Sequence, residues 1–181
     1  VWYYTQGSDP LYFEGTRVAA HEWDVALRTA VRSAQQAECF ATNGANCAED
    51  YPMYEGQQEM NADAIALAWE KRNCLRDRNL SGDREAQCST RIAEIAQTRG
   101  YDPAVVSIAQ MEPMVVLCHS PIEANDPALC QGARLPENIT AADCERRFRE
   151  ALGDGQDELY LACQAAHRVR PGDLRYHQVN V

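Results

Sequence analysis

Eight cysteines constrain the folding of this 181-residue chain more than any other feature of its sequence. Taken in order they form four consecutive pairs, and the midpoint of each pair falls in or beside a turn-forming run: Thr42-Asn43-Gly44, Ser81-Gly82, Asn125-Asp126-Pro127 and Gly153-Asp154-Gly155. Two residues equidistant from the turn of an antiparallel hairpin come together, and a disulfide needs Cα atoms about 4.4–6.8 Å apart. The spacing therefore predicts the disulfides Cys39–Cys47, Cys74–Cys88, Cys118–Cys130 and Cys144–Cys163.

A second pairing is compatible with the same reasoning in the C-terminal half. Cys130 and Cys144 are centred on residue 137, in the turn-like run Leu135-Pro136-Glu137-Asn138, and this pair could nest inside Cys118–Cys163. The sequence leaves open whether Cys130 pairs with Cys118 or with Cys144. Cys-x-x-Cys spacings typical of zinc sites or thiol redox catalysis are absent.

The segments between the turns are rich in helix-forming residues and lack alternating β-branched runs. Helices are expected at about 16–39, 57–78, 84–98, from Asp102-Pro103 until Pro113 kinks or divides the helix before Cys118, from Thr140, and at about 156–168. The predicted fold class is all-α: disulfide-stapled antiparallel helical hairpins with extended N- and C-terminal arms. The predicted organisation is an aromatic arm at 1–15, a helical domain at 16–168 and a tail at 169–181. The sequence leaves open whether the helical domain is divided into halves 16–100 and 101–168.

Two of these helices carry recognisable stripes. The first has apolar positions at three- and four-residue spacing: Trp23, Leu27, Ala30, Val31 and Ala34. The second places Lys71 on the same face as Leu67 and Cys74, where the aliphatic part of the lysine could cover that face.

The aromatic arm is the predicted contact surface for other proteins. It contains Trp2, Tyr3, Tyr4, Tyr12 and Phe13, and tyrosine and tryptophan are enriched in interface cores. Two interpretations have equal weight: the arm binds a partner, or it folds back onto its own helices.

The composition excludes several classes of partner. The net charge of −10 disfavours binding to nucleic acid. No stretch approaches the roughly 20 apolar residues of a transmembrane span. The chain starts at Val1 without an apolar leader, which leaves open whether a targeting segment was removed.

Motifs that carry catalysis or bind cofactors are not found, so we expect no catalytic residues, no metal and no cofactor. His21 and Asp24 could share a helix face as two metal ligands, but the pattern is more typical of a solvated helix start. Cys118 and His119 are adjacent and would point apart in a helix. Two glycosylation sequons, starting at Asn79 and Asn138, lie at expected turns.

Helical hairpins closed by cysteines resemble the twin-cysteine (coiled-coil-helix-coiled-coil-helix) proteins of the mitochondrial intermembrane space, some of which are accessory subunits of respiratory complexes. The resemblance lies in architecture, because the intervals between paired cysteines differ from those of the family. It implies a non-catalytic subunit of a large assembly, in an oxidising compartment, that binds other protein subunits partly through its terminal arms. The alternatives are a lumenal subunit of a photosynthetic complex and a secreted, disulfide-rich helical carrier of a small apolar ligand.

Overall fold

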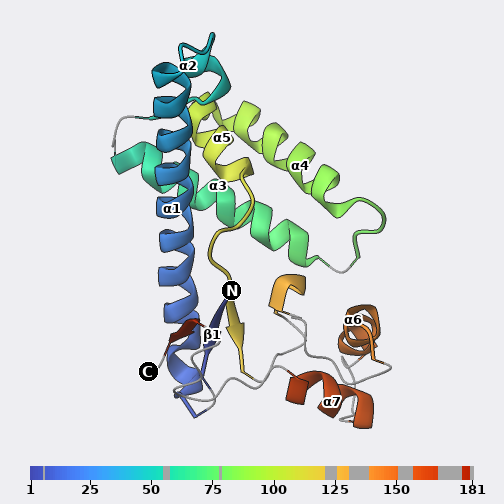
Figure 1. Cartoon of the computed structure of the whole chain (residues 1–181). Helices are drawn as coiled ribbons and strands as arrows, with labels where there is room; N and C mark the ends of the chain where they lie inside the picture. The colour runs from blue at the N-terminus through green and yellow to red at the C-terminus, as the bar shows by residue number, and fades with distance from the viewer. Residues whose placement is uncertain are drawn as a thin grey trace. The chain divides into compact units, whose positions relative to one another are not determined.

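The computed structural model describes residues 1–5, 7–54, 58–77, 79–120, 126–130, 139–150, 157–166 and 177–179. The chain divides into two compact units: a middle unit, residues 21–114, and a terminal unit, residues 1–20 together with 115–181 (Figure 1). This division differs from the expected halves at 16–100 and 101–168. The helix that follows Pro103 belongs with the helices before it, and the N-terminal segment belongs with the chain after residue 114.

The middle unit is helical. It contains most of α1 (Phe13–Ala41), then α2 (Cys47–Asp50), α3 (Gln58–Arg76), α4 (Arg84–Arg99) and α5 (Pro103–Gln110). Helix α3 packs against both α4 and α5 around a core that includes Leu67, Ile92 and Ile108 (Figure 1). The expected boundaries are present: Asp102 caps α5 with Pro103 in its first turn, and Gly100 ends α4 in the left-handed conformation at φ 68°.

A small sheet lies in the terminal unit, so the expectation of an all-α fold is met only approximately. The three strands β1 (Trp2–Tyr4), β2 (Leu117–His119) and β3 (His177–Val179) form a parallel sheet with β1 in the centre. The expected helix does not continue past Pro113, since α5 ends at Gln110 and the backbone of Met111 is extended. A proline nearby removes a backbone donor and disfavours helix in the residue before it. The apolar run that follows forms β2 instead, and the two terminal segments pair with each other through β1 and β3.

The rest of the terminal unit consists of short helices: η1 (Pro10–Tyr12), η2 (Ala128–Cys130), α6 (Ala141–Glu150) and α7 (Glu158–Ala166). Thr140 begins α6 as expected, because its hydroxyl accepts a hydrogen bond from the backbone N–H of Asp143 while the Asp143 carboxylate accepts one from the backbone N–H of Thr140. The expected turn at Gly153-Asp154-Gly155, the sequon asparagine Asn138 and most of the tail lie outside the described residues.

All four disulfides favoured by the midpoint reasoning are present, with Cα–Cα distances of 5.6–5.7 Å. Cys130 pairs with Cys118, which settles the alternative that the sequence left open. The sulfurs of the terminal unit also take part in its core, because Cys118, Cys130, Cys144 and Cys163 are all fully buried and cluster with Tyr3 and Val116.

Candidate functional site

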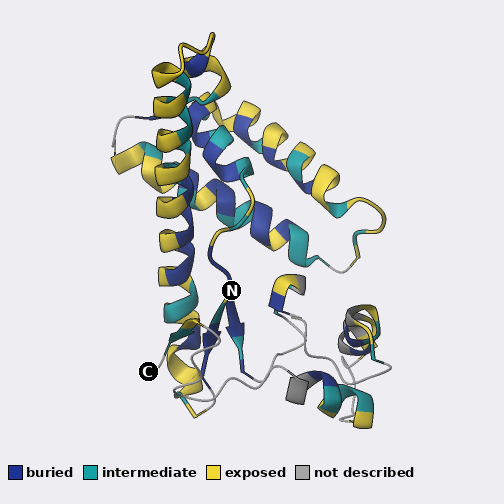
Figure 2. Ribbon diagram, viewed as in Figure 1, coloured by how far each residue is buried: buried dark blue, intermediate teal, exposed yellow. Residues whose placement is uncertain are grey.

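Helix α1 combines buried charged residues with an exposed apolar stripe, which is unusual for a surface helix. On the side that faces α3 and α5 it buries His21, Asp24 and Arg28, each at most 2% exposed. The other side of the helix is exposed to solvent (Figure 2), and it carries several apolar residues. A surface helix of a globular protein normally buries its apolar stripe. The exposed apolar stripe and the buried charges of α1 therefore make this helix the candidate functional site.

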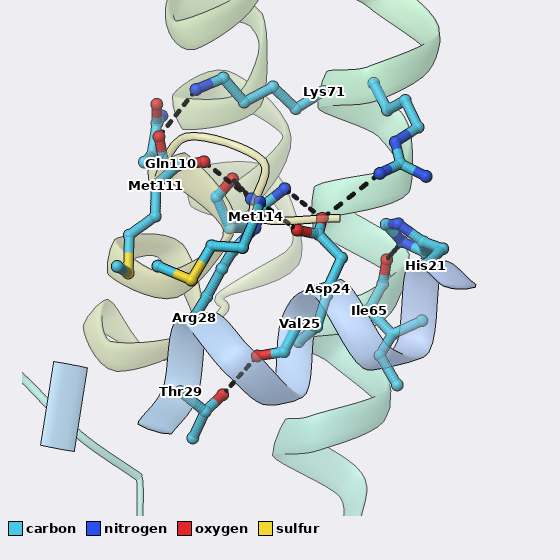
Figure 3. Close-up of polar contacts among 12 residues, drawn as sticks. His21, Asp24, Val25, Arg28, Thr29, Ile65, Lys71, Gln110, Met111 and Met114 are labelled. Atoms are coloured by element: carbon cyan, nitrogen blue, oxygen red, sulfur yellow. Dashed lines mark hydrogen bonds and ion pairs between the residues drawn. The ribbon is translucent and has the colours of Figure 1, made fainter. Parts of the chain in front are cut away.

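The buried side is organised around Asp24, whose side chain is fully buried (Figure 3). Its Oδ2 accepts a hydrogen bond from Nη2 of Arg28 at 2.5 Å and is 3.4 Å from Nη2 of Arg72, a residue of α3. Its Oδ1 accepts the backbone N–H of Met114 at 2.6 Å. Both carboxylate oxygens are therefore engaged, and one negative charge serves two buried guanidinium groups.

The need for these charges comes from the C-terminus of α5. The last carbonyls of a helix have no partner within the helix and must find donors when they are buried. Arg28 donates through Nη1 to the carbonyls of Ala109 (3.1 Å) and Met111 (2.8 Å), and Lys71 donates to that of Gln110 at 2.7 Å. Cations at a helix C-terminus are also favoured by the helix dipole. The network, which we call the α5 cap, fixes α1, α3 and α5 together.

Lys71 is 4% exposed, and its charge is balanced by Glu85 of α4 at 2.5 Å. The sequence predicted that the aliphatic part of Lys71 covers an apolar face, but it did not predict that the ammonium group binds the carbonyl of Gln110 and the carboxylate of Glu85. The sequence contained one signal for the cap: Asp24 and Arg28 are opposite charges at i, i+4. The arginine of α3 and the carbonyls of α5 had no local signal, because they lie far away in the chain.

His21 lies beside the α5 cap as a neutral side chain. Its Nε2 donates to the carbonyl of Ile65 at 2.9 Å, and its ring meets that of Trp69 edge-on with centroids 4.6 Å apart. Among the described residues Nδ1 has no hydrogen-bond partner, so a second proton on the ring would have no acceptor. Burial lowers the pKa of His21 from 6.5 to about 4. The solvated helix start expected for this stretch is wrong, because α1 begins at Phe13 and places His21 and Asp24 well inside the helix.

The opposite side of the helix defines what we call the α1 apolar face: Trp23, Ala26, Leu27, Ala30, Val31 and Ala34, all of them exposed. Trp23 is 60% exposed, and Leu27 and Val31 are 39% and 37% exposed. The stripe that predicts this helix from the sequence is therefore the solvent side of α1. Contiguous exposed apolar patches commonly mark interaction sites.

The aromatic arm, predicted as an interface, is placed mainly inside the terminal unit. Tyr3, Tyr4 and Phe13 are 4–5% exposed, and Phe13 meets Tyr4 edge-on at 5.3 Å between ring centroids. The alternative interpretation, that the arm folds back on its own chain, describes these three residues. Trp2 is partly buried, while Tyr12 is 53% exposed in η1. Contact between Tyr12 and a partner stays a prediction.

A histidine–carboxylate pair occurs in the terminal unit. Nδ1 of His119 donates to Oδ1 of Asp126 at 2.8 Å, and Oδ2 of Asp126 accepts the backbone N–H of His119 at 3.0 Å. Phe13 stacks on the His119 ring with centroids 3.4 Å apart. These contacts attach the chain before η2 to β2 inside the loop closed by Cys118–Cys130. The adjacent Cys118 has no free thiol that could act as a nucleophile with His119, since its sulfur is in that disulfide.

The comparisons with family models, curated proteins and solved structures find no match. Among the described residues there is no group of three or more side chains suited to hold a metal ion. No helix in that part of the chain is long and apolar enough to cross a membrane. The class that the fold itself defines is a mostly helical protein with four disulfides, which is typical of an oxidising, non-cytosolic environment.

Proposed function

We propose that this protein is a non-catalytic accessory subunit that binds and braces a larger protein assembly. The observation that carries the proposal is the α1 apolar face, with Trp23 at 60% exposure on a helix that buries His21, Asp24 and Arg28. A solvent-facing Trp–Leu–Val stripe has no stabilising role in a free monomer. The same stripe becomes the core of an interface once a partner covers it.

The design of the buried side supports a bracing role. In the α5 cap both oxygens of Asp24 and both Nη atoms of Arg28 are engaged. Arg28 joins α1 to the end of α5, and Asp24 joins α1 to Arg72 of α3. Replacing such a network with apolar residues is often neutral or stabilising, so a network of this kind is better explained by the specific arrangement that it imposes. Here it holds α1 in one rotation about its axis, with the apolar residues outward.

The native size of the protein tests this proposal. Extracts of its own cells, kept non-reducing, are separated by size-exclusion chromatography and probed with an antibody. We expect the protein to elute with a particle much larger than a single chain. The amount of the chain in that particle should be stoichiometric with the other subunits. Elution as a lone monomer with a small apolar ligand would replace the proposal with the carrier function.

For the compartment we propose the mitochondrial intermembrane space, with a respiratory complex as the assembly. The support is the number of disulfides together with the hairpin architecture, and a lumenal subunit of a photosynthetic complex remains the second candidate. In isolated mitochondria, protease should leave the protein intact until the outer membrane is ruptured. Recovery from the thylakoid lumen would move the subunit to the photosynthetic alternative.

One observation favours the secretory pathway instead. The sequon Asn79-Leu80-Ser81 lies between α3 and α4, and both Asn79 and Ser81 are exposed. An N-linked glycan on Asn79 requires passage through the secretory pathway. The intact mass of the native protein decides: we expect the unmodified mass, and a glycan on Asn79 would assign the protein to the secreted class.

A further inference from the structure

The α1 apolar face has the periodicity of a surface that receives another helix. Trp23, Leu27, Ala30 and Ala34 follow one another at four- and three-residue spacing, with Ala26 and Val31 beside them. Residues at these intervals lie on one side of an α-helix and form the ridges that interdigitate in helix–helix packing. The face therefore continues over about three helical turns without a polar interruption.

The small side chains set how closely a partner can approach. Three of the six positions are alanine, and all three are exposed: Ala26, Ala30 and Ala34. Helix axes pack about 8–10 Å apart, and small residues at the contact favour the lower end of this range. Trp23 and Leu27 supply large side chains at the N-terminal end of the face, where they can insert between those of an opposing helix. An amphipathic helix with its own apolar stripe matches this relief, as in helix-in-groove recognition.

The charges around the face determine which kind of helix fits. Glu22 and Glu38, near the two ends of the face, are exposed, and neither is in an ion pair with another of the described residues. The positive charges of the same stretch are turned inward, since Arg28 is 2% exposed and Arg32 lies over the ring of Tyr51. The rim of the face is therefore acidic, on a chain whose net charge is −10.

This charge pattern disfavours a second copy as the occupant. Two copies would each bring a net charge of −10 and the same glutamates to one interface, where like charges repel. A partner with lysine or arginine at its borders would instead gain from Glu22 and Glu38. We infer that the α1 apolar face binds an amphipathic helix of a different protein, whose apolar stripe is bordered by lysine and arginine. This inference rests on the proposed function and names the partner chemistry.

Site-specific photo-crosslinking tests the inference directly. A benzophenone amino acid is introduced at Ala30, at the centre of the face, and, as a matched control, at Ala93, an exposed alanine of α4. The variants are expressed in the protein's own cells and irradiated in the native assembly, and the adducts are sequenced. Position 30 should yield one major adduct, at least about tenfold above position 93, on a peptide with helical apolar spacing and flanking basic residues.

Other adducts would overturn the inference. A crosslink between two copies of this chain identifies self-association, and an adduct with lipid identifies a membrane surface. A peptide without a helical apolar stripe or without basic borders shows a different recognition chemistry. Equal yields at positions 30 and 93 show that the face has no specific partner.

Charge substitutions provide a second readout that does not depend on the photo-reactive group. Ala30→Glu places a carboxylate in the centre of the interface and should reduce recovery with the assembly by at least about tenfold. Ala93→Glu adds the same charge outside the face and should leave recovery unchanged. Glu22→Lys with Glu38→Lys should weaken binding and reduce its sensitivity to salt. Circular dichroism and the number of free thiols confirm that each variant is folded and fully oxidised.

The experiment separates the two claims. If the wild-type chain is found in no larger assembly, the proposed function fails, and the inference fails with it. If the wild-type chain is in an assembly but Ala30→Glu is recovered as well as Ala93→Glu, the subunit role stands and only the docking of a helix on α1 is wrong.

Discussion

Asp24 is the residue on which the middle unit depends most. It is fully buried, and it is the carboxylate that contacts both Arg28 and Arg72. Burying three charged groups is costly, and the cost is recovered only while the opposite charges and the hydrogen bonds remain together. Removing one charged partner should therefore lower the free energy of unfolding by more than the loss of its own hydrogen bonds, because the remaining charges stay buried.

Replacing Asp24 with asparagine tests this dependence. Asp24→Asn keeps the shape of the side chain but removes the buried negative charge that contacts the guanidinium groups of Arg28 and Arg72, so the free energy of unfolding should fall by about 3–5 kcal/mol. Denaturant unfolding with the disulfides intact gives this value. Glu22→Gln, which removes the neighbouring exposed charge, should change it by less than about 0.5 kcal/mol. A loss below about 1 kcal/mol in Asp24→Asn would show that the network is not a major source of stability.

His21 gives the middle unit a defined dependence on pH. Burial lowers its pKa from 6.5 to about 4, so the unfolded chain takes up a proton between these values while the folded chain does not. The resulting stabilisation is complete above about pH 6.5 and is lost as the pH falls toward 4, at a total cost of about 3 kcal/mol. His21→Gln keeps a donor for the carbonyl of Ile65 but does not titrate. The difference in unfolding free energy between the two proteins should therefore narrow or reverse as the pH falls through this window, and a constant difference would contradict the assignment.

At the scale of elements, each disulfide closes a segment of the chain between two cysteines that are 8–19 positions apart in the sequence. The segment between α1 and α2 shows how closely the sulfurs approach the backbone. A Cβ atom at Gly44 would lie 2.5 Å from the Sγ of Cys39 and 3.3 Å from that of Cys47. Glycine is needed here because of the close approach of the sulfur to the backbone rather than because of its conformational freedom.

Gly44→Ala should therefore impair the Cys39–Cys47 bond. We expect a mixture in which part of the protein has two free thiols, with a loss of about 2–3 kcal/mol in the molecules that lack the bond. Thiol titration and intact mass measure the fraction. Gly15→Ala is the matched control, since a Cβ there would meet no atom within 4 Å in α1, and it should be neutral or stabilising by about 0.5–1 kcal/mol. Full oxidation of Gly44→Ala would show that the segment has room that the structure does not indicate.

Local signals in the sequence predicted most of the helical elements, and they failed where the contacts are distant. Asp102, Pro103 and Gly100 mark helix ends through the backbone groups that they satisfy, so they could be interpreted from neighbouring residues alone. Strand β2 could not, because its three residues pair with β1, more than a hundred positions away in the sequence. Parallel pairing of short strands leaves no alternating pattern or hairpin turn to detect.

For the whole molecule, the sequence predicted those features of the candidate site that depend on neighbouring residues, and it did not predict those that depend on residues far away in the chain. The apolar stripe of α1 was visible from its spacing, but its direction was not. Whether Trp23 or Asp24 faces inward depends on the carbonyls that α5 presents, and those are defined only in the folded unit. The midpoints of the cysteine pairs predicted the disulfides because a hairpin is a local structure. The compartment and the assembly remain proposals.

Footprinting of the tryptophans tests the central claim, that the chain is built to present the α1 apolar face to a partner. The oxidation rate of Trp23 by hydroxyl radicals is compared between the native assembly and the isolated, fully oxidised protein, with the partly buried Trp69 as the internal reference. Trp23 should be reactive in the isolated protein and strongly protected in the assembly. Equal reactivity of Trp23 in the two states would contradict the account.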